Sequence, residues 1–171
     1  FAHLAEEAGT LAHDVAGLCA TPADSGLAAA RQQFGATALA YARAEFLRIG
    51  PLGSGDRMER LLFWPDRKGI ALRQVQAALA EADPTAAAPE TLRRKSVAMQ
   101  GLVAVEYLLF GTGSDDLAAG AAYRCSYAAA ATTLIAGLAG EIDAEWRDTG
   151  PAGIAARPAR LETRLLSLTV A

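Results

Sequence analysis

The sequence predicts an all-α protein, an up-down helical bundle with a short irregular insert around residues 50–69. The chain is 52% hydrophobic, and its most abundant residue is alanine, the strongest helix former. β-Branched and aromatic residues, which favour strands, are sparse. Apolar residues recur at helical spacing along most of the 171 residues, with short connections between these stretches. This length is enough for a domain with a sizeable core.

The first two predicted helices cover residues 1–19 and 24–49. Thr21 and Pro22 separate them, and Asp24 or Ser25 can cap the second. Each helix has one apolar stripe that should face the core. The stripes consist of Leu4, Leu11, Val15 and Leu18 in the first helix, and of Leu27, Phe34, Ala38, Tyr41, Phe46 and Ile49 in the second.

The insert begins with a loop rich in glycine and proline at residues 50–55. Asp56 can cap a short helix over residues 57–63, which Pro65 ends. A turn over residues 66–69 completes the insert. Irregular backbone on a rigid bundle is where binding groups tend to lie, so this segment is expected to contribute to a site.

An amphipathic helix is predicted over residues 70–82, with Leu72, Val75 and Leu79 facing inward. A helical turn follows from Pro89, because proline is well tolerated at the first helical position. The next helix starts at about residue 92 or 95 and ends at Phe110, before two glycines.

The last long helix is expected to start at Asp115 or Asp116 and to end near Trp146. The Asp-Thr-Gly-Pro sequence at positions 148–151 is the clearest break in the chain. We therefore predict one helical bundle over residues 1–147 and the start of a second, incomplete helical half over residues 148–171. An amphipathic helix begins at about residue 161 in that second part.

The helix that ends at Phe110 is apolar on nearly every side, a pattern typical of a central, buried helix. Glu106 is the exception. A buried carboxylate costs several kcal/mol unless it is protonated, paired with a base or bound to a cation. Two interpretations follow. Glu106 is either a ligand or acid–base group in a pocket, or the acidic partner of Arg57, Arg60 or Arg124 in a structural ion pair.

Other charged and aromatic residues have both a functional and a structural interpretation. Arg57 and Arg60 share a helix face and either clamp an anion or lie on a solvated turn. Trp64 is expected to fill space inside the bundle, and Asp66 to serve as a turn or cap residue.

His3 has Glu6 and Glu7 at helical spacing, which is half of a metal site at most. The chain contains no nucleophile elbow, phosphate loop, dinucleotide-binding fingerprint or His-Glu-x-x-His sequence. Its two histidines, near one end, do not supply the ligands that a zinc peptidase needs.

Charge and hydropathy exclude two classes of partner. The net charge of −3 leaves no basic surface for nucleic acid and no polybasic membrane patch. The apolar run over residues 117–140 is mostly alanine and contains Arg124, so it is expected to be a core helix rather than a membrane span. The two cysteines, Cys19 and Cys125, form either one disulfide in an oxidising compartment or two buried thiols.

Three segments resemble a known family. Residues 101–106, Gly-Leu-Val-Ala-Val-Glu, followed by Tyr-Leu-Leu-Phe-Gly, look like the Gly-x-His-x-x-Glu motif of imelysin-like proteins. Residues 45–51 resemble the end of an early helix in that family, and residues 63–66, Phe-Trp-Pro-Asp, its Trp-Pro element. The resemblance covers about residues 41–111.

The resemblance implies an all-helical fold of two bundle-like halves, located in the periplasm or cell envelope, with the functional site between the halves around the motif helix. The founding member is described as an insulin-cleaving membrane protease, and other members are linked to iron uptake. Val103 stands at the motif histidine position here, whereas Gly101 and Glu106 match. Family members are usually longer, so this chain resembles the first half and the start of the second. The implied oxidising location favours a bridge between Cys19 and Cys125.

The sequence therefore predicts a non-catalytic, imelysin-like binding protein of the cell envelope, associated with iron or metal uptake. Its pocket is expected to hold an anionic or small organic ligand, or to bind a metal only weakly through Glu106. The predicted ligand-binding residues are Glu106, Arg57, Arg60, Asp66, Gln100 and Gly101. The alternatives are a metallopeptidase and a structural or partner-binding bundle with Glu106 in a closed salt bridge.

The cofactor expected from the resemblance is iron or another divalent metal ion. Other iron-uptake proteins of the envelope are the expected partners. Contact with a membrane is expected only through a lipid anchor that this chain does not include.

Overall fold

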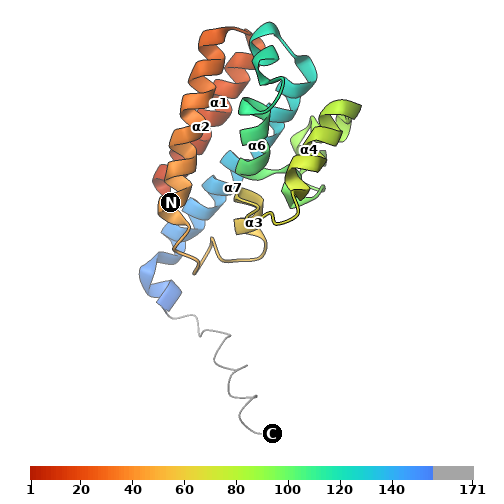
Figure 1. The fold of residues 1–171 in the computed structure, drawn as a ribbon. Coiled ribbons are helices and arrows are strands. Elements are labelled where there is room, and N and C mark those ends of the chain that lie inside the picture. Colours follow the sequence, from red (N-terminus) through yellow and green to blue (C-terminus); the bar gives the residue numbers. More distant parts are fainter. Residues whose placement is uncertain (156–171) are drawn as a thin grey trace, which may run out of the picture.

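A computed structural model describes residues 1–155 and confirms the all-α fold, with no strand in this part of the chain. Figure 1 shows α1 and α2 as a long pair, with α6 and α7 beside them and α4 on the outside. The α-helices are α1 (Ala2–Ala20), α2 (Asp24–Ala44), α3 (Arg57–Leu61), α4 (Ile70–Glu81), α5 (Pro89–Leu92), α6 (Gly101–Phe110) and α7 (Ala122–Ala155). Three short 3-10 helices connect them: η1 (Pro84–Ala86), η2 (Val97–Met99) and η3 (Ser114–Ala119).

The core of the bundle forms around α1, which packs against both α2 and α7, while α6 packs against α7. The stripe predicted for α1 is confirmed, because its apolar residues recur every three or four positions and so face one side. The buried residues of α1 are Leu4, Ala8, Leu11, Val15 and Leu18. Short alanine side chains on α1, α2 and α7 let these helices approach closely.

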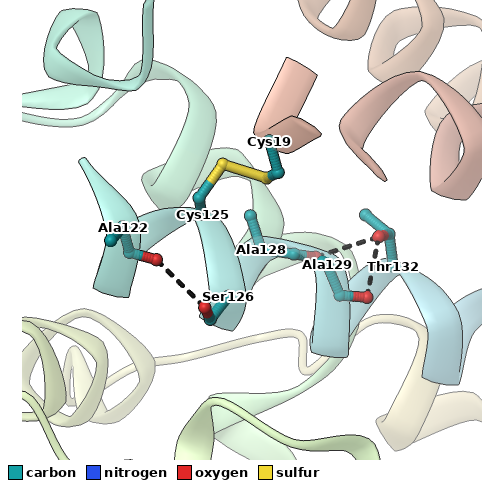
Figure 2. The surroundings of a disulfide bond; sticks show 7 residues. All are labelled: Cys19, Ala122, Cys125, Ser126, Ala128, Ala129 and Thr132. Carbon is teal, nitrogen blue, oxygen red and sulfur yellow. Dashed lines mark hydrogen bonds between the residues drawn. A yellow bond between two sulfur atoms is a disulfide. The ribbon is translucent and has the colours of Figure 1, made fainter. Parts of the chain in front are cut away.

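A disulfide joins α1 to α7. Figure 2 shows the bond between Cys19, near the end of α1, and Cys125, in the first turn of α7. The bridge implied by the family resemblance is therefore present, and neither cysteine is a free thiol. Deeper in α7, the fully buried Thr132 donates its hydroxyl hydrogen bond to the carbonyl oxygen of Ala128 at 2.9 Å, so it adds no unpaired polar group to the core.

Several predicted helix bounds are wrong, and α7 also continues to Ala155 rather than ending near Trp146. α2 ends at Ala44 rather than near residue 49, and the apolar side chains of Phe46 and Ile49 are exposed. Asp115 does not cap α7, since it lies in η3 together with Asp116. Gly120, with a φ of 86°, separates η3 from α7. The third helix, α6, begins only at Gly101.

The α7 helix contains a kink at Gly150, where the backbone leaves helical geometry with a φ of 60° and a ψ of 170°. The kink lies within the break predicted at residues 148–151. The division into units 1–147 and 148–171 stays a prediction, and the helix predicted from residue 161 lies outside the described residues. By length and composition alone, α7 is apolar enough to cross a membrane, but half of its most apolar stretch is buried inside the bundle.

Two predictions about inward-facing residues are also wrong. Trp64 does not fill the bundle interior, because 74% of its surface is exposed. Leu72 of α4 is 46% exposed, while the buried face of α4 consists of Ala71, Val75 and Ala78. Trp64 follows α3 and is joined to Pro65 by a cis peptide bond. The large apolar side chains of Trp64 and Leu72 thus lie on the surface beside α6.

Candidate functional site

The motif helix α6 presents Glu106 to solvent, so the prediction that this carboxylate is buried is wrong. Side chains at Val103, Glu106, Tyr107 and Phe110 share one face of α6, and none of them is buried. Three of these four residues are apolar or aromatic. The sequence pattern therefore predicted a helix that is buried on every side, although this side of α6 faces outward. The buried residues of α6 are Gly101, Leu102, Ala104, Val105, Leu108 and Leu109.

Two grooves flank this outward face of α6. The larger, which we call the α4-side groove, has a volume of about 490 Å³ and lies between α6 and α4. The α2-side groove has a volume of about 230 Å³ and lies between α6 and α2. Leu62 and Glu106 line both grooves. The α4-side groove is lined further by Trp64, Asp66, Ala71, Leu72, Val75, Val103, Tyr107, Phe110 and Gly111, and the α2-side groove by Phe34, Ala38, Tyr41, Ala42, Glu45 and Leu102.

Within the described part of the chain, the charged residues that line these two grooves are all acidic: Glu45, Asp66 and Glu106. The pKa of Tyr41, in the α2-side groove, is raised to about 12, first by burial and then by the negative charge of Glu45. Among the described residues, Glu106 forms neither a hydrogen bond nor an ion pair, so the closed salt bridge with Arg57, Arg60 or Arg124 is wrong.

Asp66 has a structural role at the edge of the α4-side groove. Its carboxylate oxygens accept hydrogen bonds of 2.8 Å from the backbone N–H groups of Ile70 and Ala71, in the first turn of α4. Partial burial raises the pKa of Asp66, but these hydrogen bonds outweigh that effect and hold its pKa below the ordinary value. The interpretation of Asp66 as a cap residue is therefore confirmed.

The predicted basic residues form a separate cleft between α3 and α7, with a volume of about 280 Å³. Arg57 makes a two-point ion pair with Glu145 of α7. Arg60 pairs with Asp56 at 2.9 Å. The structure thus does not bring Arg57 and Arg60 together with Glu106, and their charges are balanced within the protein. The cleft is lined by Asp56, Arg57, Arg60, Arg93, Gln100, Leu134, Leu138 and Glu141.

Gln100 lies in this basic cleft, not beside Glu106. Its side chain is buried, and its amide oxygen accepts a hydrogen bond of 3.1 Å from Arg60. Its amide nitrogen donates to the carbonyl oxygen of Lys95 at 2.9 Å. Gln100 therefore links α3 to the segment before α6.

The backbone at Gly101 requires a glycine, the residue that the motif has at this position. Its φ is 69°, a conformation that side-chain-bearing residues rarely adopt. A Cβ atom at this position would lie 2.3 Å from the carbonyl oxygen of Arg60 and 2.7 Å from that of Leu61. The end of α3 thus packs directly against the start of α6, which sets where the motif helix begins.

Two arginines, Arg31 and Arg124, bind the other end of α6. Arg31 of α2 donates to the carbonyl oxygen of Leu109 at 2.7 Å, and its guanidinium lies over the Phe110 ring at 5.5 Å. Arg124 of α7 donates to the carbonyl oxygens of Leu108 at 3.1 Å and Thr112 at 2.6 Å. These cations satisfy carbonyl groups that a helix end leaves unpaired. No local pattern could have revealed Arg31, since it lies 78 positions from Leu109.

Replacing Arg124 by alanine is expected to lower the free energy of unfolding by about 2 kcal/mol, because charge-assisted hydrogen bonds to partly buried carbonyl groups are lost. Chemical denaturation measures this change. Arg94→Ala is the matched control, since Arg94 is exposed and its side chain has no partner among the described residues. Equal stability of the two variants would show that Arg124 does not hold the end of α6.

The described residues contain no group of three or more metal-ligating side chains. His3 lies 3.5 Å from Glu7 and 4.0 Å from Glu6 on the exposed start of α1, far short of a closed ligand set. If Glu106 binds a metal, the described residues supply no complete ligand set around it.

A family model described as Imelysin, Peptidase M75, matches residues 1–164. A crystal structure of an imelysin-like protein from Psychrobacter arcticum 273-4 is similar in fold, with a TM-score of 0.74 and 22% sequence identity. The similarity covers 86% of this chain and 45% of that one, so the matched part spans less than half the length of that protein. No curated protein matches the sequence.

Proposed function

Because the chain belongs to the imelysin family, we propose that it is a non-catalytic binding protein of the cell envelope, associated with the uptake of iron or another metal. The observation that carries the proposal is the position of Glu106, on an exposed face of the motif helix between two apolar-walled grooves. A carboxylate that has no partner among residues 1–155 is available to a bound ligand.

Three further observations support this proposal. The disulfide between Cys19 and Cys125 is stable in an oxidising compartment such as the bacterial periplasm. Val103 replaces the histidine of the motif, so the helix offers a carboxylate without an imidazole. The grooves of about 490 and 230 Å³ have walls that are mostly apolar, which suits recognition rather than metal-assisted hydrolysis.

Growth under iron limitation tests the proposed role. A strain with Glu106→Ala in its chromosomal gene is expected to grow more slowly than wild type when an iron chelator limits growth, and equally well when iron is abundant. Glu90→Ala, at an exposed carboxylate outside both grooves, is the control and should grow like wild type. Growth of the Glu106→Ala strain that equals wild type under limitation, with equal protein levels, would contradict the proposal.

The second candidate is a metallopeptidase, which the printed name of the family and the retained Glu106 favour. A peptidase would need further metal ligands from outside the described residues. Isothermal titration with ferrous, ferric, zinc and copper ions, combined with an insulin-cleavage assay, distinguishes the two. Metal-dependent cleavage that is abolished by a chelator and by Glu106→Gln would establish the peptidase and remove the non-catalytic proposal.

A further inference from the structure

We propose that the disulfide between Cys19 and Cys125 is a redox-sensitive catch on the motif helix. Its reduction by a dithiol releases Arg124 from the end of α6 and loosens the helix that carries Glu106. This inference rests on the proposed binding role at Glu106 and adds the regulation of that site. It is carried by the position of Arg124 beside Cys125, and by the weak local stabilisation of the two helix ends that the bridge joins.

The bridge and the contact with α6 come from adjacent residues in the first turn of α7. Cys125 is bonded to Cys19, near the end of α1 (Figure 2), and Arg124 precedes Cys125 in the chain. Arg124 donates to the carbonyl oxygens of Leu108 at 3.1 Å and Thr112 at 2.6 Å. One helical turn thus carries both the bond to α1 and a contact that holds the end of α6.

Arg124 also contacts the residue next to Glu106. Its guanidinium lies over the ring of Tyr107 at 5.9 Å, and Tyr107 lines the α4-side groove. The negative charge of Asp116 in η3 attracts Arg124, but these two residues make neither a hydrogen bond nor an ion pair with each other. The position of the guanidinium therefore depends on where the first turn of α7 holds its backbone.

The two helix ends that the bridge joins lack the usual local stabilisation. The first turn of α7 contains no acidic residue, and it contains the cation of Arg124, which the positive end of the helix dipole disfavours. Ala121 precedes α7 and has no side chain that can cap the helix. The last turn of α1 contains no basic residue. The bridge therefore supplies a restraint that the sequence around it does not.

Other contacts limit how far the structure loosens. The hydroxyl groups of Tyr123 and the buried Tyr127 each donate to a backbone carbonyl oxygen outside α7, at 2.8 Å, so α7 as a whole stays in the bundle. Arg31 still binds the carbonyl oxygen of Leu109 from α2. The end of α6 thus loses one of its two arginines on reduction and opens more often, without leaving the bundle.

Reduction proceeds by thiol–disulfide exchange. Cys19 is half-buried whereas Cys125 is buried, so a thiolate of the dithiol attacks the sulfur of Cys19, and Cys125 leaves as a thiolate. The second thiolate of the dithiol then attacks the dithiol's own sulfur in the mixed disulfide and releases Cys19. Two electrons pass to the cysteines, which take up the two protons that the dithiol gives up, and the dithiol becomes a disulfide.

Native-state amide hydrogen exchange tests this inference, because it reports the local opening of a helix. The amide of Gly111 donates to the carbonyl oxygen of Tyr107 at 2.9 Å at the end of α6. Its exchange rate is measured in the oxidised protein and in excess dithiothreitol, and the ratio of the two rates is the quantity of interest. The ratio is compared between the wild type, Arg124→Ala and the exposed control Arg94→Ala.

Reduction also lowers the global stability, but this effect is common to the three proteins, so the difference between their ratios reports the coupling. We expect a ratio roughly tenfold larger in the wild type and in Arg94→Ala than in Arg124→Ala, where the contact is already absent. Arg124→Lys keeps the charge but not the forked geometry, and it gives the same comparison if Arg124→Ala does not fold. Equal ratios in all the proteins would overturn the inference.

Failure of this test is distinguishable from failure of the proposed function. If the ratios are equal but Glu106→Ala still slows growth under iron limitation, the redox-sensitive catch is wrong and the binding role stands. If the ratios differ as expected but the Glu106→Ala strain grows like wild type, reduction loosens α6 as inferred and the binding role is wrong.

Discussion

Replacing Cys19 and Cys125 together by alanine is expected to lower the free energy of unfolding by roughly 4–5 kcal/mol. The two cysteines lie 106 positions apart, so the bridge removes much of the conformational freedom of the unfolded chain. It also joins α1 to α7, the helices that pack most extensively in the bundle. Urea unfolding of the oxidised wild type and the double variant measures the difference.

Reduction provides the matched control for this prediction. Wild type in excess dithiothreitol should unfold at nearly the same urea concentration as the double variant, whereas the double variant itself should not respond to reductant. For a chain of this size the expected loss corresponds to a melting temperature lower by roughly 10–15 °C. A double variant within 1 kcal/mol of oxidised wild type would show that the bridge contributes little.

Gly101→Ala is expected to destabilise the protein by roughly 3 kcal/mol. One part of the cost is conformational, because alanine is strained at a φ of 69°. The other part is steric, because the new methyl group would overlap the carbonyl oxygens of Arg60 and Leu61 unless α3 moves away from α6. Chemical denaturation measures the loss, and a shifted near-ultraviolet circular dichroism spectrum would report the displaced helices.

Gly35→Ala is the control for this substitution. Gly35 lies inside α2, and a Cβ atom there would meet nothing within 4 Å. The control is expected to be neutral or to stabilise the protein by up to about 1 kcal/mol, since alanine is the better helix former. If Gly101→Ala were as stable as Gly35→Ala, the close approach of α3 to α6 would not hold in solution.

The helical architecture could be predicted because it depends on local pattern. The stripe of α1 repeats at helical spacing, and the sequence placed α1 and α4 within about a residue of their observed bounds. Helix ends were harder to predict. α6 starts at Gly101 because of a contact with the end of α3, and α7 starts after Gly120 because that glycine breaks the helix.

The site was harder to predict than the fold because hydrophobicity does not determine which side of a helix is covered. Val103 and Phe110 made α6 look buried on every side, yet they face an open groove with Glu106 between them. The arginines expected beside Glu106 instead find acidic partners of their own, such as Glu145 for Arg57. Arg60 pairs with Asp56 at a helical spacing of four, which a spacing rule reveals, whereas Arg57 pairs with Glu145, 88 positions away, through a tertiary contact that no spacing rule reveals.

The separation of the two sites changes the kind of ligand that the protein is expected to recognise. A pocket that combined Glu106 with Arg57 and Arg60 would accept an anionic ligand. The observed grooves instead place carboxylates among apolar walls, away from Arg57 and Arg60. The basic cleft between α3 and α7 stabilises the start of α6 through Gln100 instead.

Mapping of the two grooves beside Glu106 by nuclear magnetic resonance tests the central claim most directly. Backbone amide shifts of the labelled chain are recorded during titration with zinc ions, one of the metals of the proposed binding role. The largest shifts are predicted for residues 103–110, the first turn of α4 and the second half of α2. Shifts centred on Arg57 and Arg60, or scattered over the acidic surface, would contradict the assignment of the Glu106 face as the recognition site.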